Sequence, residues 1–177
     1  EESKKDSFTS LVKPFKAEYT ILHKSKSVGK GVRQLEQLSN NTYKYSYTTD
    51  IEWLIFDDIR TEDSIVKIEN NYVIPTHYHY MRAGTGRDKS NEWTYDVVNN
   101  TARNLDKKET ISIDYPQNIQ DKLSYHLQHR LNLINNPEQK VFIYPVIKTS
   151  GKISNYTYEY DKKEELMLQY GWVKTIK

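Results

Sequence analysis

The sequence contains no cysteine, and this absence excludes several kinds of chemistry. A chain without thiols forms no disulfide bond, provides no cysteine nucleophile and has no thiolate ligand for a metal ion. Both exported and cytosolic proteins can lack cysteine, so this absence alone does not decide the compartment.

Long apolar runs and a strong net charge are also lacking. No apolar stretch approaches the roughly 20 residues of a membrane-spanning helix, so we expect no transmembrane segment. The 26 basic and 24 acidic residues are interspersed and give a formal net charge of +2. Because a nucleic-acid-binding protein usually has a strongly basic face, we expect no nucleic-acid partner.

Tyrosine is abundant, at 15 of the 177 positions, and many Ile, Val and Thr residues accompany it. These residues favour strands, and pairs such as Asn70-Asn71 and Asn99-Asn100 predict turns between them. We predict a mainly β protein, with a curved antiparallel sheet or open β-barrel wrapping one helix. The length suits a single domain over residues 14–177, after a flexible charged segment at residues 1–13. Residues 171–177 look like a strand just beginning, so we expect the domain to be truncated at its C-terminal end.

One segment departs from the strand pattern and predicts a helix over residues 119–134. Its apolar side chains recur every three or four residues and so share one helical face: Ile119, Leu123, Leu127, Leu131 and Ile134. Asn118 is the expected N-cap, and Asp121 takes the acidic position of a capping-box-like start. Ser124 lacks the Gly-x-Ser-x-Gly context of a hydrolase nucleophile, so we expect no catalytic role for it.

The most concentrated polar and aromatic feature is a predicted β-hairpin over residues 75–95, with a glycine-containing turn. We expect Arg82 to pair with Arg87 across this turn, which places four aromatic side chains on one face. Such a face can stack a sugar ring or an acyl chain, or it can pack onto the core through cross-strand pairs. The four aromatic residues are Tyr78, Tyr80, Trp93 and Tyr95.

The opposite face of this hairpin carries His77 and His79, and the same pairing sets Glu92 opposite His77. Two imidazoles and a carboxylate can coordinate zinc or copper, so these three residues are the candidate metal ligands. A spacing of two residues has no specificity without a third ligand, and the alternative is an ordinary solvated strand face.

Basic residues surround the turn of the same hairpin. Arg82 and Arg87 can grip a phosphate or carboxylate through the guanidinium fork, and we include them among the candidate ligand-binding residues. The Gly84-x-Gly86 pattern lacks the following helix of a phosphate-binding loop, and Asp88 neutralises part of the charge, so a solvated turn is the alternative. We expect no bound cofactor.

Several short phrases, taken in order and spacing across nearly the whole chain, resemble one known family. They are PFKAEY (14–19), GKG (29–31), VIP (73–75), YHY (78–80), GTGRDK (84–89), YD (95–96), QDKLSY (120–125), GKI (151–153) and EEL (164–166). The chain resembles the uncharacterised bacterial envelope proteins catalogued as domain of unknown function 3108. The resemblance implies export to the periplasm behind a signal peptide and an antiparallel β architecture around a helix. It supplies no activity and no catalytic residues.

These observations predict a non-catalytic periplasmic protein that binds an apolar or glycan-type ligand, a lipid or a saccharide, or assists envelope assembly. The four aromatic residues of the hairpin would then line the binding groove. One alternative is a metal-dependent hydrolase that uses His77, His79 and Glu92. A second alternative is a scaffold that pairs with another envelope protein through exposed strands.

Overall fold

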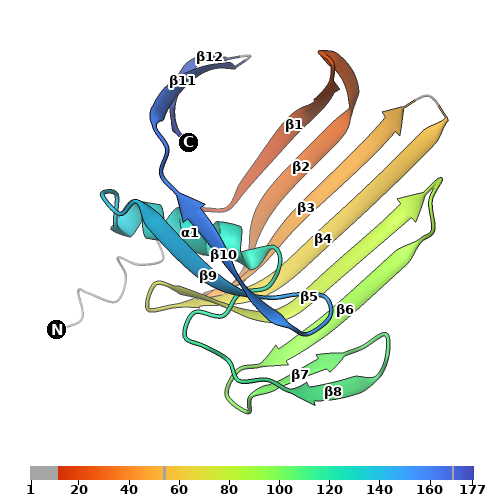
Figure 1. The fold of residues 1–177 in the computed structure, drawn as a ribbon, viewed down its shortest axis with the longest axis vertical. Coiled ribbons are helices and arrows are strands. Elements are labelled where there is room, and N and C mark those ends of the chain that lie inside the picture. Colours follow the sequence, from red (N-terminus) through yellow and green to blue (C-terminus); the bar gives the residue numbers. More distant parts are fainter. Residues whose placement is uncertain (1–11, 54, 169) are drawn as a thin grey trace.

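A large antiparallel sheet dominates the computed structural model, which describes residues 12–53, 55–168 and 170–177. Eight strands follow one another in chain order, and each pairs with its neighbours in the sequence (Figure 1). Their bounds are β1 (Phe15–His23), β2 (Lys26–Ser39), β3 (Thr42–Trp53), β4 (Phe56–Glu69), β5 (Tyr72–Gly84), β6 (Lys89–Asp96), β7 (Thr101–Asn104) and β8 (Glu109–Ser112). The sheet is curved and does not close, which confirms the predicted curved antiparallel sheet around one helix.

The helix and the hairpin that directly follows it form a cover on one face of this sheet (Figure 1). Helix α1 (Ser124–Asn135) is followed by the hairpin of β9 (Val141–Ile147) and β10 (Ile153–Glu159). A second hairpin joins β11 (Lys163–Leu168) to β12 (Gly171–Ile176). In the described part of the chain, no helix has the length and apolarity needed to cross a membrane.

The turns of the sheet follow the local chemistry of the sequence. Asn70 and Asn71 join β4 to β5 with φ of 50° and 70°, the left-handed conformation that asparagine tolerates and that a tight hairpin requires. Asn100, with φ of 51°, lies in the turn before β7. Both predicted asparagine turns are therefore confirmed.

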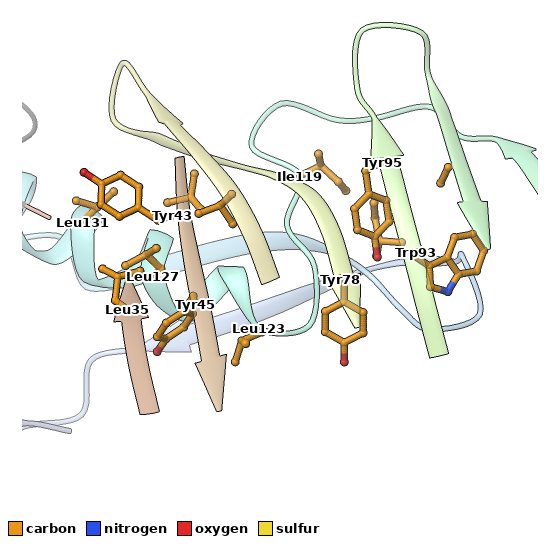
Figure 2. Close-up of a cluster of buried hydrophobic side chains, with 14 of the residues drawn as sticks. Leu35, Tyr43, Tyr45, Tyr78, Trp93, Tyr95, Ile119, Leu123, Leu127 and Leu131 are labelled. Atoms are coloured by element: carbon orange, nitrogen blue, oxygen red, sulfur yellow. The ribbon is translucent and has the colours of Figure 1, made fainter. Parts of the chain in front are cut away.

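The core lies between the sheet and α1. The strand register places one buried side chain from each central strand in a lateral row, and Figure 2 shows Leu35, Tyr45, Tyr78 and Trp93 following one another across the strands. They belong to the same hydrophobic cluster as Leu123, Leu127 and Leu131. We call the helix-bearing side the inner face, and its buried row consists of Leu35, Tyr45, Ser64, Tyr78 and Trp93. Val12 is also buried in this core, so the packed domain begins before Pro14, and residues 1–11 of the predicted flexible segment lie outside the described residues.

A buried carboxylate, Asp121, connects the helix to the sheet. Its Oδ2 accepts a hydrogen bond from the Ser64 hydroxyl of β4, and its Oδ1 accepts the backbone N–H groups of Leu123 (2.8 Å) and Ser124 (2.6 Å). The Ser124 hydroxyl oxygen accepts the Asp121 N–H in return at 2.9 Å. This reciprocal arrangement has the bonding of a capping box, with Asp121 as the capping side chain.

The predicted start of the helix is therefore wrong. Helix α1 begins at Ser124, and Asn118, the predicted N-cap, has a left-handed φ of 63°. The intervening Gln120 instead forms a parallel bridge with β9, donating its N–H to Pro145 O and accepting the Ile147 N–H, each at 2.8 Å. Ile119 still packs in the core, as its apolar spacing predicts, but the backbone from Ile119 to Leu123 is not helical.

Two buried glutamines complete the edge of β5. Strand β6 pairs with β5 only from His77 onward, which leaves the backbone of Val73 without a strand neighbour on that side. Gln128 Oε1 accepts the Val73 N–H at 2.6 Å, and Gln120 Nε2 donates to the Val73 carbonyl at 2.7 Å. The side chains of the cover thus satisfy backbone groups that would otherwise be buried without partners.

We expect Ser64→Ala to lower the free energy of unfolding by about 1–3 kcal/mol, because it leaves one oxygen of a buried carboxylate unsatisfied. Asp121→Asn is expected to cost less than Asp121→Ala, because the amide retains an acceptor for the helix N–H groups and can donate to Ser64. Urea unfolding followed by circular dichroism measures both effects. Ser39→Ala, at the exposed end of β2, is the matched control. Equal stability of Ser64→Ala and Ser39→Ala would contradict this role.

Candidate functional site

Three of the four predicted ligand-contacting aromatic residues belong to the core. Tyr78, Trp93 and Tyr95 are 1%, 4% and 7% exposed, and Tyr78 pairs directly with Trp93. They pack under the cover and do not line an open groove, which corrects that prediction. Cross-strand packing of aromatic side chains onto the core explains the pattern that the sequence displayed.

The hairpin register also differs from the prediction. Arg82 pairs with Lys89 rather than Arg87, so His79, and not His77, lies opposite Glu92. The shift amounts to two residues and leaves every side chain on its predicted face. The longer turn is held by Thr85, whose N–H donates to Asp57 O and whose hydroxyl accepts the Asp57 N–H, both at 2.8 Å.

The histidines lie on the outer face, as their alternation predicts. His77 Nε2 and Glu92 Oε1 form a hydrogen-bonded pair at 2.8 Å. Among the described residues, no three His, Asp or Glu side chains lie close enough together to hold a metal ion. The structure thus brings two of the candidate ligands together as an ordinary polar pair, and the metal-dependent hydrolase stays a prediction without a supporting observation.

The fourth aromatic residue, Tyr80, lies where the cover ends. Tyr80 lies two residues along β5 from Tyr78, and it belongs to a second row of paired side chains next to the buried row. All members of this second row are partly exposed. We call this the boundary row, and it alternates aromatic with polar or charged side chains across five strands: Arg33, Tyr47, Glu62, Tyr80 and Asn91. The Arg33 guanidinium lies 4.7 Å from the centre of the Tyr47 ring, and Glu62 accepts a hydrogen bond from Tyr78 at 2.9 Å.

From Tyr47 of the boundary row onward, the open inner face of β1 and β3 is apolar apart from Thr49. We call this surface the apolar strip, and it consists of Tyr19, Ile21, Tyr47, Ile51 and Trp53. Tyr19 is 50% exposed and Trp53 is 44% exposed. A side chain at Gly31, between the two strands, would contact the Tyr47 ring at 3.6 Å and Tyr19 Cβ at 3.7 Å. Both tyrosines therefore lie within van der Waals reach of the β2 backbone at Gly31.

The same open region of β4 and β5 is charged. Asp58 Oδ1 and Oδ2 each accept a hydrogen bond from Arg60 at 2.9 Å, and Arg82 Nη2 lies 3.0 Å from Asp58 Oδ2. The hydrogen bonds from Arg60 are the largest cause of a lowered pKa of the Asp58 carboxyl, and the hydrogen bond from Arg82 acts in the same direction. Arg82, a predicted ligand-binding residue, is therefore engaged with a carboxylate of its own sheet, although two arginines share that single negative charge.

Arg87, the other predicted basic residue, lines a polar cleft with a volume of about 550 Å³. The cleft lies between the β5–β6 hairpin and the loop segments that hold Lys122 and Thr149. Its lining includes Tyr80, Arg87, Lys89, Asn91, Lys122 and Thr149. Two predicted ligand-contacting residues, Tyr80 and Arg87, thus come together in one cleft, and Lys122 is a member that sequence reasoning missed.

A second aromatic cluster joins α1 to β10. The His129 ring stacks on Tyr158 with centroids 4.1 Å apart, and the Tyr158 hydroxyl lies 3.1 Å from His126 Nδ1. Burial lowers the pKa of His126 to about 4, and the charge of Arg33 and that of His129, when His129 is protonated, act in the same direction. Burial also lowers the pKa of His129. Burial also raises the pKa of Tyr144 to about 12, and its hydroxyl lies 3.0 Å from His129 Nδ1. This cluster therefore packs with its histidines neutral at pH 7.

Comparisons with known proteins identify no relative: no family model, no curated protein and no solved structure matches the chain.

The lowered pKa of His126 predicts that stability falls with acidification. The unfolded chain binds this proton near pH 6.5 and the folded chain near pH 4, so the unfolded state binds more protons between these values. Asp121 acts in the opposite sense, because burial raises its pKa and its protonation favours the folded state.

His126→Phe therefore isolates the histidine contribution. Between pH 7 and pH 4.5 we expect the parent protein to lose on the order of 1–2 kcal/mol more unfolding free energy than this variant, after allowance for solvent screening. His79→Phe, on the outer face, is the control and should follow the parent. Parallel pH profiles for the parent and His126→Phe in urea unfolding would contradict the assignment.

Proposed function

We propose that the protein is a non-catalytic periplasmic protein that binds an apolar or glycan-type ligand or assists envelope assembly. The observation that carries the proposal is the apolar strip, which continues from the core onto a part of the inner face that no described element covers. The periplasmic location rests on the family resemblance of the sequence.

The apolar strip has the chemistry and the length needed to bind an extended ligand. From Tyr47 to Trp53 the exposed part of β3 extends about 20 Å, at roughly 3.3 Å per residue, which suits a long acyl chain or a few sugar rings. Trp53 lies against His23 of β1 with ring centroids 3.9 Å apart, so the two strands present one continuous surface. Flat aromatic faces bind both hydrocarbon and the apolar faces of sugars.

A ligand bound on the apolar strip lies against Trp53, so tryptophan fluorescence can report its binding. We expect 9,10-dibromostearic acid to quench part of the tryptophan fluorescence, or a neutral glucose oligosaccharide to shift its emission. Trp53→Phe should abolish the response, whereas Trp172→Phe, on the C-terminal hairpin, should keep it. Tyr47→Ala should weaken binding, and Met81→Ala, an exposed apolar residue on the outer face, is its matched control. No response of Trp53 to either probe would contradict the proposal.

The C-terminal hairpin favours one second candidate, a scaffold that pairs with another envelope protein. Met167 and Trp172 lie opposite each other in this hairpin and are 64% and 70% exposed. A photo-crosslinking residue in place of Trp172 should then trap one specific envelope protein in cells. The same residue in place of Val98, in an exposed turn, is the control, and the same products from both positions would exclude specific pairing.

A further inference from the structure

The cleft beside the boundary row has an excess of positive charge. Arg87, Lys89 and Lys122 all contribute to its lining, and Asp88 is the acidic residue there. Within the described residues, Asp88 forms no ion pair with any of these three cations. The basic side chains are therefore available to an anion from outside the protein.

The cleft also presents a neutral donor in a fixed orientation. The indole N–H of Trp93 donates to Asn91 Oδ1 at 2.8 Å and to the Thr149 carbonyl at 3.1 Å. Since Trp93 is buried, this bond holds the Asn91 amide with its oxygen toward the indole and leaves Nδ2 as the donor for another group. No described protein group accepts a hydrogen bond from Asn91 Nδ2.

A flat aromatic ring completes the cleft. Tyr80 contributes to the lining, and Lys122 Nζ lies 5.8 Å from the centre of its ring. An aromatic face, an amide donor and several cations together match a sugar ring that carries a phosphate group. The volume of about 550 Å³ is large enough for one such unit.

The cleft is connected to the apolar strip by the boundary row. Tyr80 pairs with Glu62, and Glu62 pairs with Tyr47, so only one strand separates the cleft from the strip. Two strand spacings, each about 4.8 Å, therefore lie between Tyr80 and Tyr47. A ligand with a polar head and an apolar tail can occupy both surfaces at once.

We propose that the cleft binds a phosphorylated sugar or polyol group, which is the headgroup of the ligand that occupies the apolar strip. The inference rests on the proposed function for the identity of the whole ligand, although the headgroup site is tested separately. The turn that carries Arg87 is held in place before binding by the Thr85–Asp57 hydrogen bonds, which reduces the entropy lost when the anion binds.

The first test is calorimetric titration of the full chain with glucose 6-phosphate, with glucose as the uncharged comparison. We expect binding of the phosphate ester, and a dissociation constant raised by about tenfold or more in both Arg87→Ala and Lys122→Ala, since each removes a charge-assisted contact. Lys67→Ala, at an exposed position of β4, is the matched control and should bind like the parent. Binding that none of the cleft substitutions weakens would overturn the proposal.

The second test separates the two sources of the headgroup. Vesicles of phosphatidylglycerol in phosphatidylcholine, compared with phosphatidylcholine alone, present the phosphate on a lipid. Binding to the anionic vesicles that Lys122→Ala weakens, without binding of glucose 6-phosphate, would assign the site to a lipid headgroup and support the proposal. If neither probe binds while dibromostearic acid still quenches Trp53, the headgroup site is overturned and the apolar strip stands.

Discussion

The burial of one carboxylate, that of Asp121, determines how the two parts of this protein fit together. The hydroxyl of Ser64 and the first N–H groups of α1 converge on its oxygens, so a single side chain both starts the helix and docks it on β4. A buried charge or polar group without partners is costly, and each partner is therefore required by the others. Gln120 and Gln128 extend the same principle to β5, because they satisfy the backbone of Val73 where β6 no longer does.

This docking covers only part of the inner face. The strands from β2 to β5 are 12–14 residues long, whereas α1 has 12 residues and lies across them, so the far ends of the strands extend beyond the cover. The position of the helix therefore decides which row is core and which is surface. Tyr78 and Tyr80 are two residues apart on the same face, yet one is buried beneath the cover and the other lines an open cleft.

The sequence contains enough information for the strand-rich class, the asparagine turns, the existence of the helix and the faces of the hairpin. Alternation is a local signal, and an error of two residues in register leaves it intact, which is why His77 and His79 face outward as predicted. The helix start could not be predicted, because Ile119 reaches the core from non-helical backbone. The boundary row could not be predicted either, because Arg33, Tyr47 and Glu62 become neighbours only through the pairing register of separate strands.

The order of the strands has a consequence for how the chain folds. Each strand of the large sheet pairs with its neighbours in sequence, so the sheet can grow hairpin by hairpin with little loss of loop entropy. The bond between Ser64 and Asp121 instead joins residues 57 positions apart, and it cannot form until α1 has been synthesised and returns to β4. Tyr43, Tyr45 and Tyr78 share one core cluster with Leu127 and Leu131 of α1, so they gain this cover only when the helix docks. A sheet that formed before helix docking would expose this aromatic row, and that species, rather than the native protein, would be the aggregation-prone one.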